Sequence, residues 1–155
     1  APHNLYRFNP STNTTQVIHH NIDIKSLIHS KGQLYIANND GLYQLINDKL
    51  IRVINEPIIA LTALSNAVIA ITANKIYKVS DDGHQFSIDH NEKLYGLTKA
   101  FDNDDFFIIC LQGKVSKYDF VTLTTLPYYY GDSEPAHIKG AFHDASGVLW
   151  LIISH

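Results

Sequence analysis

The chain has 155 residues, of which 45% are hydrophobic and 17% charged, with a formal net charge of −3 at pH 7. This length is enough for one domain with a sizeable core, and this composition is typical of a globular domain and excludes an intrinsically disordered one. No basic stripe indicates a nucleic-acid partner, and apolar runs such as 67–73 are far shorter than the roughly 20 residues of a membrane helix.

Two strands, 5–8 and 15–19, are predicted at the start of the chain, and a unit of four strands follows them. In this unit the Leu-, Ile- and Tyr-rich segments 33–37 and 42–46 flank the sequence Asn-Asn-Asp-Gly, whose residues tolerate the left-handed backbone of a tight turn. Two similar units follow, and no segment keeps apolar residues at helical spacing. The twelve strands predicted for the three units are 23–28, 33–37, 42–46 and 50–54; 58–64, 67–72, 75–79 and 85–88; 94–101, 105–111, 114–119 and 122–126.

The units are near copies of one another. Apolar segments that begin at Leu34, Val68, Phe106 and Leu149 recur about every 40 residues, which is typical of β-propeller blades. A β-sandwich also has short, evenly spaced strands, but its strands are not copies of one another. The sequence therefore predicts an all-β protein, a β-propeller of four-stranded antiparallel blades with about four blade-equivalents.

The ends of the chain are predicted to hold two half blades. The first pair of strands resembles the third and fourth strands of a unit, and the last pair, 138–142 and 148–153, resembles the first and second. Joined, the two halves would close a four-bladed ring without exposed edges; the alternative, which we favour, is a segment of a longer propeller. We expect one propeller domain or segment over 1–155, with blade units 22–54, 57–88 and 93–126 and half blades 4–20 and 137–153.

Two segments resemble the two-component-regulator propeller repeat, whose pattern is D-x-x-G-x-L-W-I-G-T followed by a turn and G-L. Segment 143–155, HDASGVLWLIISH, matches it with Asp144, Gly147, Leu149, Trp150 and Leu151. Segment 31–43 matches it with Gly32, Leu34, Tyr35, Ile36, Ala37, Gly41, Leu42 and Tyr43. The resemblance covers about half of the chain and is eroded in 67–79 and 105–118. It implies a periplasmic or extracellular sensor region of a signal-transduction protein. Such a region would pass its signal to a membrane-spanning histidine kinase or a transcription regulator.

The motif also has a physical reading. The second strand of a blade packs between neighbouring blades, so we expect both of its faces to be buried, with Tyr35 and Trp150 in the core. Asp144 is expected to accept a hydrogen bond from the backbone two residues further on, and Gly147 is expected to adopt a positive φ in the turn.

No residue pattern predicts a catalytic, metal or cofactor site. The nine histidines lack the H-x-H and H-E-x-x-H spacings of metal sites, and His19 and His20, being adjacent on a strand, point to opposite faces. The acidic clusters 81–83 and 102–105 lack the full spacing of a calcium loop and are interpreted as hairpin turns. The single cysteine, Cys110, lies in an apolar run and is expected to be a buried small side chain. We expect no enzyme, metal or cofactor, although a propeller active site assembled from distant loops would leave no such motif.

The loops between blades, and those between second and third strands, are expected to share one face of the propeller, where ligands bind. Our first hypothesis is a non-catalytic sensor of a small polar ligand or glycan at this face. The second is a protein-interaction scaffold, with a protein partner at this face or self-association through blade edges, and the third is a propeller lyase or hydrolase. The predicted ligand-binding residues are Asn38, Asn39, Asp40, His90, Asn91, Glu92, Tyr129, Tyr130 and His137.

Overall fold

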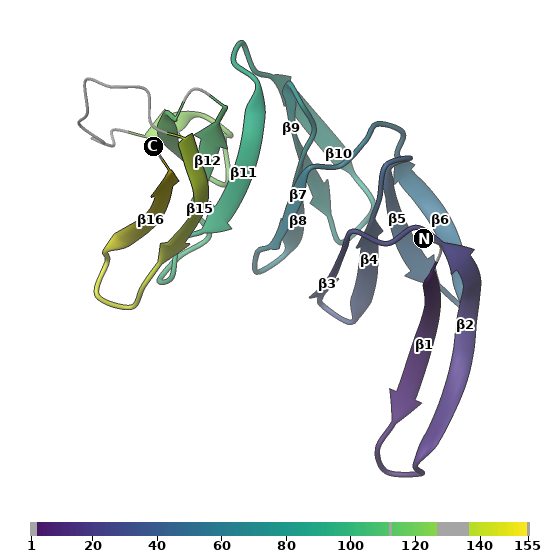
Figure 1. Cartoon of the computed structure of the whole chain (residues 1–155). Coiled ribbons are helices and arrows are strands. Elements are labelled where there is room, and N and C mark those ends of the chain that lie inside the picture. The colour runs from purple at the N-terminus through teal and green to yellow at the C-terminus, as the bar shows by residue number, and fades with distance from the viewer. Residues whose placement is uncertain (1–2, 112, 127–136, 155) are drawn as a thin grey trace.

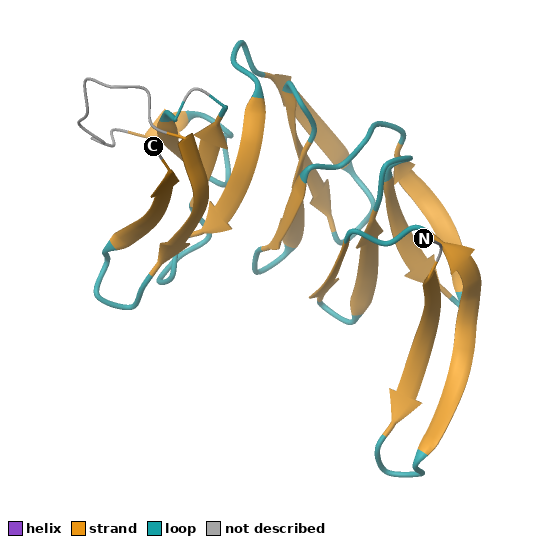
Figure 2. Cartoon of the chain, viewed as in Figure 1, coloured by secondary structure: helices purple, strands orange, loops and turns teal. Residues whose placement is uncertain are grey.

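The computed structural model describes residues 3–111, 113–126 and 137–154, and these form strands and loops without any helix (Figures 1 and 2). In this described part of the chain, no helix is long and apolar enough to cross a bilayer. The sixteen strands are β1 His3–Asn9, β2 Thr14–Ile22, β3 Ser26–Ser30, β4 Gln33–Ala37, β5 Leu42–Ile46, β6 Lys49–Ile54, β7 Ala60–Ala63, β8 Ala67–Ile71, β9 Lys75–Ser80, β10 Gln85–Asp89, β11 Leu94–Lys99, β12 Phe106–Cys110, β13 Val115–Tyr118, β14 Thr125–Leu126, β15 His137–His143 and β16 Leu149–Ser154.

The strands form three four-stranded sheets and two hairpins. The sheets contain β3–β6, β7–β10 and β11–β14, each antiparallel and in chain order, whereas β1–β2 and β15–β16 are separate two-stranded sheets. The five sheets follow one another along an arc, and the two hairpins lie at its opposite ends (Figure 1). The predicted all-β propeller architecture is confirmed, as part of a ring: the end hairpins do not join into one blade.

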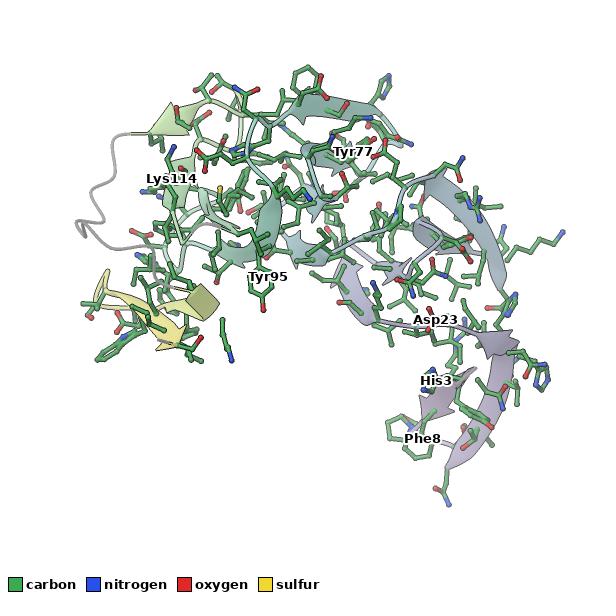
Figure 3. The ribbon with its side chains drawn as sticks, turned by 45° about the horizontal axis from the view of Figure 1, so that its top comes forward. His3, Phe8, Asp23, Tyr77, Tyr95 and Lys114 are labelled. Carbon is green, nitrogen blue, oxygen red and sulfur yellow. The ribbon has the colours of Figure 1, made fainter. Side chains whose placement is uncertain are left out.

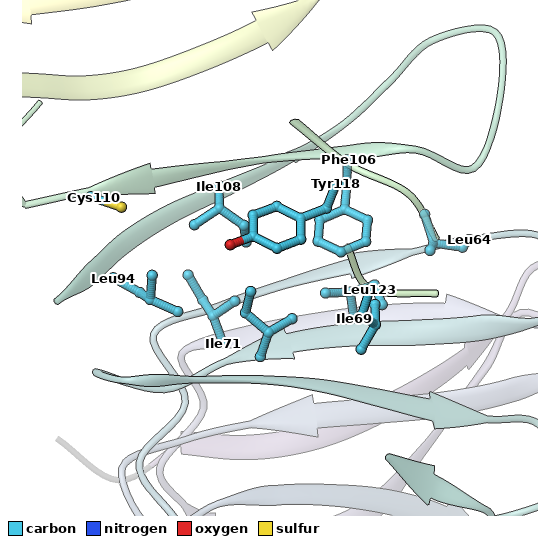
Figure 4. Close-up of a cluster of buried hydrophobic side chains, with 10 residues drawn as sticks. Leu64, Ile69, Ile71, Leu94, Phe106, Ile108, Cys110, Tyr118 and Leu123 are labelled. Atoms are coloured by element: carbon cyan, nitrogen blue, oxygen red, sulfur yellow. The ribbon is translucent and has the colours of Figure 1, made fainter. Parts of the chain in front are cut away.

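Adjacent sheets bury apolar side chains between them. The first strands of successive blades, β3, β7, β11 and β15, pack next to one another and so line the inside of the arc. The second strands β8 and β12 are buried along their whole length, because each lies between two sheets. Figure 4 shows the cluster between the second and third blades, where the rings of Phe106 and Tyr118 stack at 5.6 Å between centroids.

Most strands differ from their predicted bounds by one or two residues, and two strands begin three residues later than predicted. The strand predicted at 122–126 shortens to β14, because the Asp119 carboxylate accepts hydrogen bonds of 2.7 Å from both the backbone N–H and the hydroxyl of Thr122. This turn also holds Leu123 at φ 53°, outside the strand region. The first blade begins at Ser26 rather than at residue 23.

The turns of the motif form as predicted. Asp144 Oδ1 accepts a hydrogen bond of 2.9 Å from Ser146 N, and Gly147 has φ +83°. Gly41, at the entry of β5, has φ +153°, and a Cβ there would lie 2.0 Å from the carbonyl oxygen of Ile54. Only glycine therefore fits between β5 and the end of β6.

The expected burial of the motif aromatics is right for one residue and wrong for the other. Tyr35 is fully buried, whereas Trp150 is 60% exposed. Its indole N–H donates to Asp144 Oδ2 at 2.6 Å across the hairpin turn. Trp150 is exposed because no described residues form a sheet beyond β15–β16 that would cover this face.

Candidate ligand-binding rim

One face of the arc gathers the connections that the sequence analysis singled out. We call this face the rim and define it by the turns after the second strands and the connections into the next blades, residues 22–25, 38–41, 55–59, 72–74, 90–93, 111 and 113–114. Backbone hydrogen bonds connect these segments: Ile58 N donates to Asn38 O at 3.1 Å, and His90 N donates to Asn74 O at 2.8 Å. The blades are therefore joined along the rim by backbone as well as by their apolar faces.

A polar pair recurs on the rim at each full blade. A carboxylate in the connection that leads into a blade bonds to a donor at the next turn of the same blade. In the first blade, Asn39 Nδ2 donates to Asp23 Oδ2 at 3.1 Å. In the second, Lys75 Nζ lies 2.7 Å from Glu56 Oε1. The third blade repeats the pattern with Lys114 and Glu92.

These pairs hold charge in place. The Lys75 ammonium and the Tyr77 hydroxyl, which donates at 2.6 Å, hold the pKa of Glu56 below its ordinary value. Lys114, 2.9 Å from Glu92, does the same to the pKa of Glu92. Both carboxylates are therefore ionised and paired near neutral pH. Such pairs hold neighbouring segments together and are poorly suited to transferring protons. Figure 3 shows Asp23, Tyr77 and Lys114 on their blades.

The first three predicted site residues belong to one turn. The Asn38 side chain is buried, and its Oδ1 accepts from the backbone of Asp40 at 2.8 Å and of Gly41 at 2.9 Å. Asn38 thus shapes the turn, and Asn39 and Asp40 are the exposed members of it. Their role as ligand-binding residues stays a prediction.

The next three predicted residues lie in the connection to the third blade. The His90 ring Nδ1 lies 2.9 Å from Glu92 O and 3.2 Å from Glu92 N, so the imidazole closes this loop. Asn91 is exposed between them. Tyr129 and Tyr130 lie outside the described residues, and His137 is described only by its backbone, which pairs with Ser154 in β15–β16.

The Cys110 thiol, at the end of β12, lies next to the Glu92 carboxylate. It is buried, as predicted, and burial together with the adjacent Glu92 carboxylate raises the pKa of its thiol to about 12. A thiol that stays protonated at neutral pH is a poor nucleophile, so this position is structural. No group of three or more His, Cys, Asp or Glu that could hold a metal ion occurs among the described residues.

A cavity at the rim was not found by the sequence reasoning. It has a volume of about 310 Å³ and lies between the third blade and β15–β16, lined by Tyr95, Leu111, Ile138, Lys139 and Ser154. Tyr95 is 44% exposed and Leu111 48%, and Figure 3 shows the Tyr95 ring projecting away from its strand. An aromatic face, apolar walls and an ammonium group in a cavity of this size suit a small ligand with an apolar face and an anionic group.

The sequence held one signal for this cavity. Tyr95 and Lys139 both lie one or two residues after the start of a first strand, and first strands line the inside of the arc. Because the two lie on separate blades, only the packing of β11 against β15 brings them to one cavity.

Comparisons with known proteins support the fold. No protein-family model matches the sequence, and no curated protein matches it. Among solved structures, the C-terminal WD40 domain of Sif2 superposes with a TM-score of 0.70 at 15% identity, over 88% of this chain and 44% of that one. The extracellular domain of the putative one component system BT4673 from B. thetaiotaomicron superposes with a TM-score of 0.71 at 18% identity, over 97% of this chain and 24% of that one.

A third structure, BBS1N in complex with ARL6DN, superposes with a TM-score of 0.66 at 15% identity, over 90% of this chain and 46% of that one. The chain has the fold of a partial β-propeller. It spans less than half the length of each of these structures. At identities this low, the likeness concerns fold alone.

Proposed function

We propose that this chain is part of a non-catalytic, ligand-sensing propeller of a bacterial signal-transduction protein, located in the periplasm or outside the cell. The observation that carries the proposal is the rim cavity, where Tyr95 and Lys139 meet from neighbouring blades. The likeness to an extracellular domain of a putative one component system supports it, since that likeness covers 97% of the chain. The repeat motif around Trp150 agrees with the same class of protein.

The cavity indicates a class of ligand. A sugar presents an apolar face that stacks on an aromatic ring, and a carboxylate on that sugar would pair with an ammonium group. Among the described residues, Lys139 has no carboxylate within ion-pair distance. We therefore propose an acidic sugar or a similar small carboxylate as the ligand, bound between Tyr95 and Lys139.

Thermal-shift measurements with galacturonic and glucuronic acid oligomers, and with their neutral counterparts, test this proposal. A ligand at one hundred times its Kd stabilises the fold by about 2.7 kcal/mol. Tyr95→Ala should abolish the shift for every ligand that binds, and Lys139→Gln should weaken the acidic ligands more than the neutral ones. The matched controls are Phe86→Ala and Lys49→Gln, which remove an exposed ring and an exposed ammonium far from the cavity. Equal shifts in Tyr95→Ala and in the native chain would contradict the proposal.

The second candidate is a protein-interaction scaffold. The structure of BBS1N, which this chain resembles in fold, was solved in complex with ARL6. A protein partner would contact a wide surface of the rim rather than one cavity. Under this candidate, exposed rim substitutions such as Asn39→Ala and Asn91→Ala weaken a partner's binding while Tyr95→Ala leaves it unchanged.

A further inference from the structure

The outermost strand of the second blade, β10, has one edge without a paired strand. Among the described residues it pairs with β9 alone, in a register without shifts over Gln85–Asp89. Four of its five residues are exposed, so no other element covers the strand. Such an edge presents a row of unpaired backbone N–H and C=O groups, to which another extended chain can pair.

The outer strands of the first and third blades are protected in ways that β10 is not. β6 carries Lys49 and Arg52 and has a register shift against β5, and β14 consists of only two residues. Charged side chains, bulges and short length keep an outer edge from pairing with a foreign strand. β10 contains no Lys, Arg or Pro. Of these three outer edges, β10 is therefore the one best suited to receive a further strand.

Hydrogen bonds on either side of β10 identify which of its backbone groups are free. Ser80 N donates to His84 O at 2.9 Å, and His90 N donates to Asn74 O at 2.8 Å. Bonded and non-bonded residues alternate along an antiparallel pair, so the even-numbered residues of β10 bond to β9. The odd-numbered residues direct their N–H and C=O groups outward. These residues are Gln85, Ser87 and Asp89.

A cavity, which we call the outer groove, lies between β10 and the third blade. It has a volume of about 240 Å³ and is lined by Lys78, Ser80, His84, Gln85, Phe86, Val121 and Thr122. Phe86 is 55% exposed and Val121 71%. Ile88 packs against the core between the second and third blades, and Phe86, two residues earlier, lies on the same face. A side chain opposite Phe86 on an added strand would therefore lie over the outer groove.

The outer groove contains an ammonium group that no carboxylate contacts. Lys78 Nζ donates to Phe120 O at 3.1 Å and lies 4.1 Å from the centroid of the Phe120 ring. In the described part of the chain, no carboxylate lies within ion-pair distance of it. Asp82 pairs with His84 instead, and Asp119 accepts two hydrogen bonds within its own turn. A carboxylate on a bound chain therefore has a complementary charge here.

We propose that β10 is a docking site for an extended segment of a partner protein, which adds as a strand to its free edge. The segment carries an apolar side chain opposite Phe86 and, two residues away, an acidic side chain that pairs with the Lys78 ammonium. Alternation along a strand places both side chains over the outer groove, while the residues between them bond to the backbone of β10. The site lies on the outside of the arc, so it is separate from the rim cavity and its ligand.

Binding of defined peptides to the chain, measured by fluorescence anisotropy, tests the mode of docking. The probe is fluorescein-labelled Thr-Ile-Thr-Glu-Thr, whose isoleucine and glutamate share one face of a strand. N-methylation of its threonines blocks pairing with β10 and should abolish binding. N-methylation of its isoleucine, whose amide points away from β10, should leave binding intact. Equal binding of the two methylated peptides, or no binding of the parent peptide up to about 1 mM, would overturn the proposal.

Substitutions in the chain locate the site. Phe86→Ala should weaken binding about tenfold, and Ser87→Pro, which removes an outward N–H from an edge strand, should abolish it. Lys78→Gln should remove a preference of about threefold for the glutamate peptide over its glutamine counterpart. Tyr95→Ala and Lys49→Gln are the matched controls and should bind like the native chain, with unfolding midpoints as the check of the fold. Unchanged binding by Phe86→Ala would place the peptide elsewhere and disprove the proposal.

Amide hydrogen exchange gives a readout that needs no substitution. The amides of Gln85, Ser87 and Asp89 should exchange fast in the free chain and slowly with the peptide bound, because only then do they have a partner. The amides of Phe86 and Ile88 bond to β9 and should be protected in both states. Peptide-induced protection that leaves the odd-numbered amides of β10 fast would contradict strand addition.

Discussion

Tyr35 and Trp150 hold the same position in two copies of one repeat, and their surroundings are opposite. Tyr35 is fully buried between the first and second blades, and Trp150 is 60% exposed on the last hairpin. Local structure is alike in both, since each lies on a second strand after a tight turn with a glycine at positive φ. The comparison shows that the repeat assigns a side chain to a face, and that a neighbouring blade decides whether this face is buried.

The largest expected effect comes from removing the two rings in turn. Tyr35→Ala should lower the free energy of unfolding by about 3–5 kcal/mol, because it leaves a cavity between two sheets. Trp150→Ala removes a ring that is mostly exposed and should change it by about 0.5 kcal/mol or less. Urea unfolding measures both, and equal losses would show that the hairpin has a buried face of its own.

Replacing a glycine should also lower the free energy of unfolding more in the first blade than in the last hairpin. Gly41→Ala places a Cβ 2.0 Å from the Ile54 carbonyl oxygen, and we expect a loss of about 3 kcal/mol from overpacking and strain. Gly147→Ala meets no atom within 4 Å and should lose about 1 kcal/mol, the cost of a left-handed backbone for alanine. The two unfolding curves decide this, and a larger loss for Gly147→Ala would contradict the steric explanation.

Removing only the Tyr35 hydroxyl tests the effect of an unpaired polar group separately from the burial of the ring. It is buried without a hydrogen-bond partner among the described residues, and burial, with the nearby Asp81 carboxylate, raises the pKa of Tyr35. Tyr35→Phe removes an unpaired polar atom and keeps the ring, so the protein should gain up to about 1 kcal/mol. A loss of stability in the same unfolding assay would show that the hydroxyl has a partner.

The smallest effect is expected at the exposed hairpin turn. Hydrogen bonds from Ser146, from the Trp150 indole and from Val148 N–H hold the pKa of Asp144 below its ordinary value. Because the folded pKa is the lower one, this turn stabilises the fold above about pH 4, the ordinary Asp pKa, and loses that contribution as the pH falls towards the folded pKa.

Trp150→Phe removes one of these donors and should raise the pKa of Asp144, as followed by carboxyl NMR titration. Asp119 is the control: Thr122 lowers its pKa through a similar turn in the third blade, and the substitution does not touch it. An unchanged Asp144 pKa would mean that the indole bond contributes nothing in solution.

The strands could be predicted from the sequence more completely than the candidate site could. Turn residues such as Asn38 and Gly41 and the alternating apolar strands depend on neighbours in the chain, so their structure could be predicted. The rim cavity could not, because Tyr95 and Lys139 belong to different blades and meet only through β11 and β15. The Asn38 side-chain oxygen is bonded within its own turn, an interaction local to the chain, and its role in ligand binding stays a prediction.

The amino-acid sequence alone determined the repeat, the pairing of strands within each blade and the face to which each side chain belongs, because these depend on period, turn chemistry and local hydrogen bonds. The tertiary structure decided how far the blades turn about their axis, which rings lose contact with water and which side chains share a cavity. Those properties arise between sheets, where burial depends on what the adjacent blade presents.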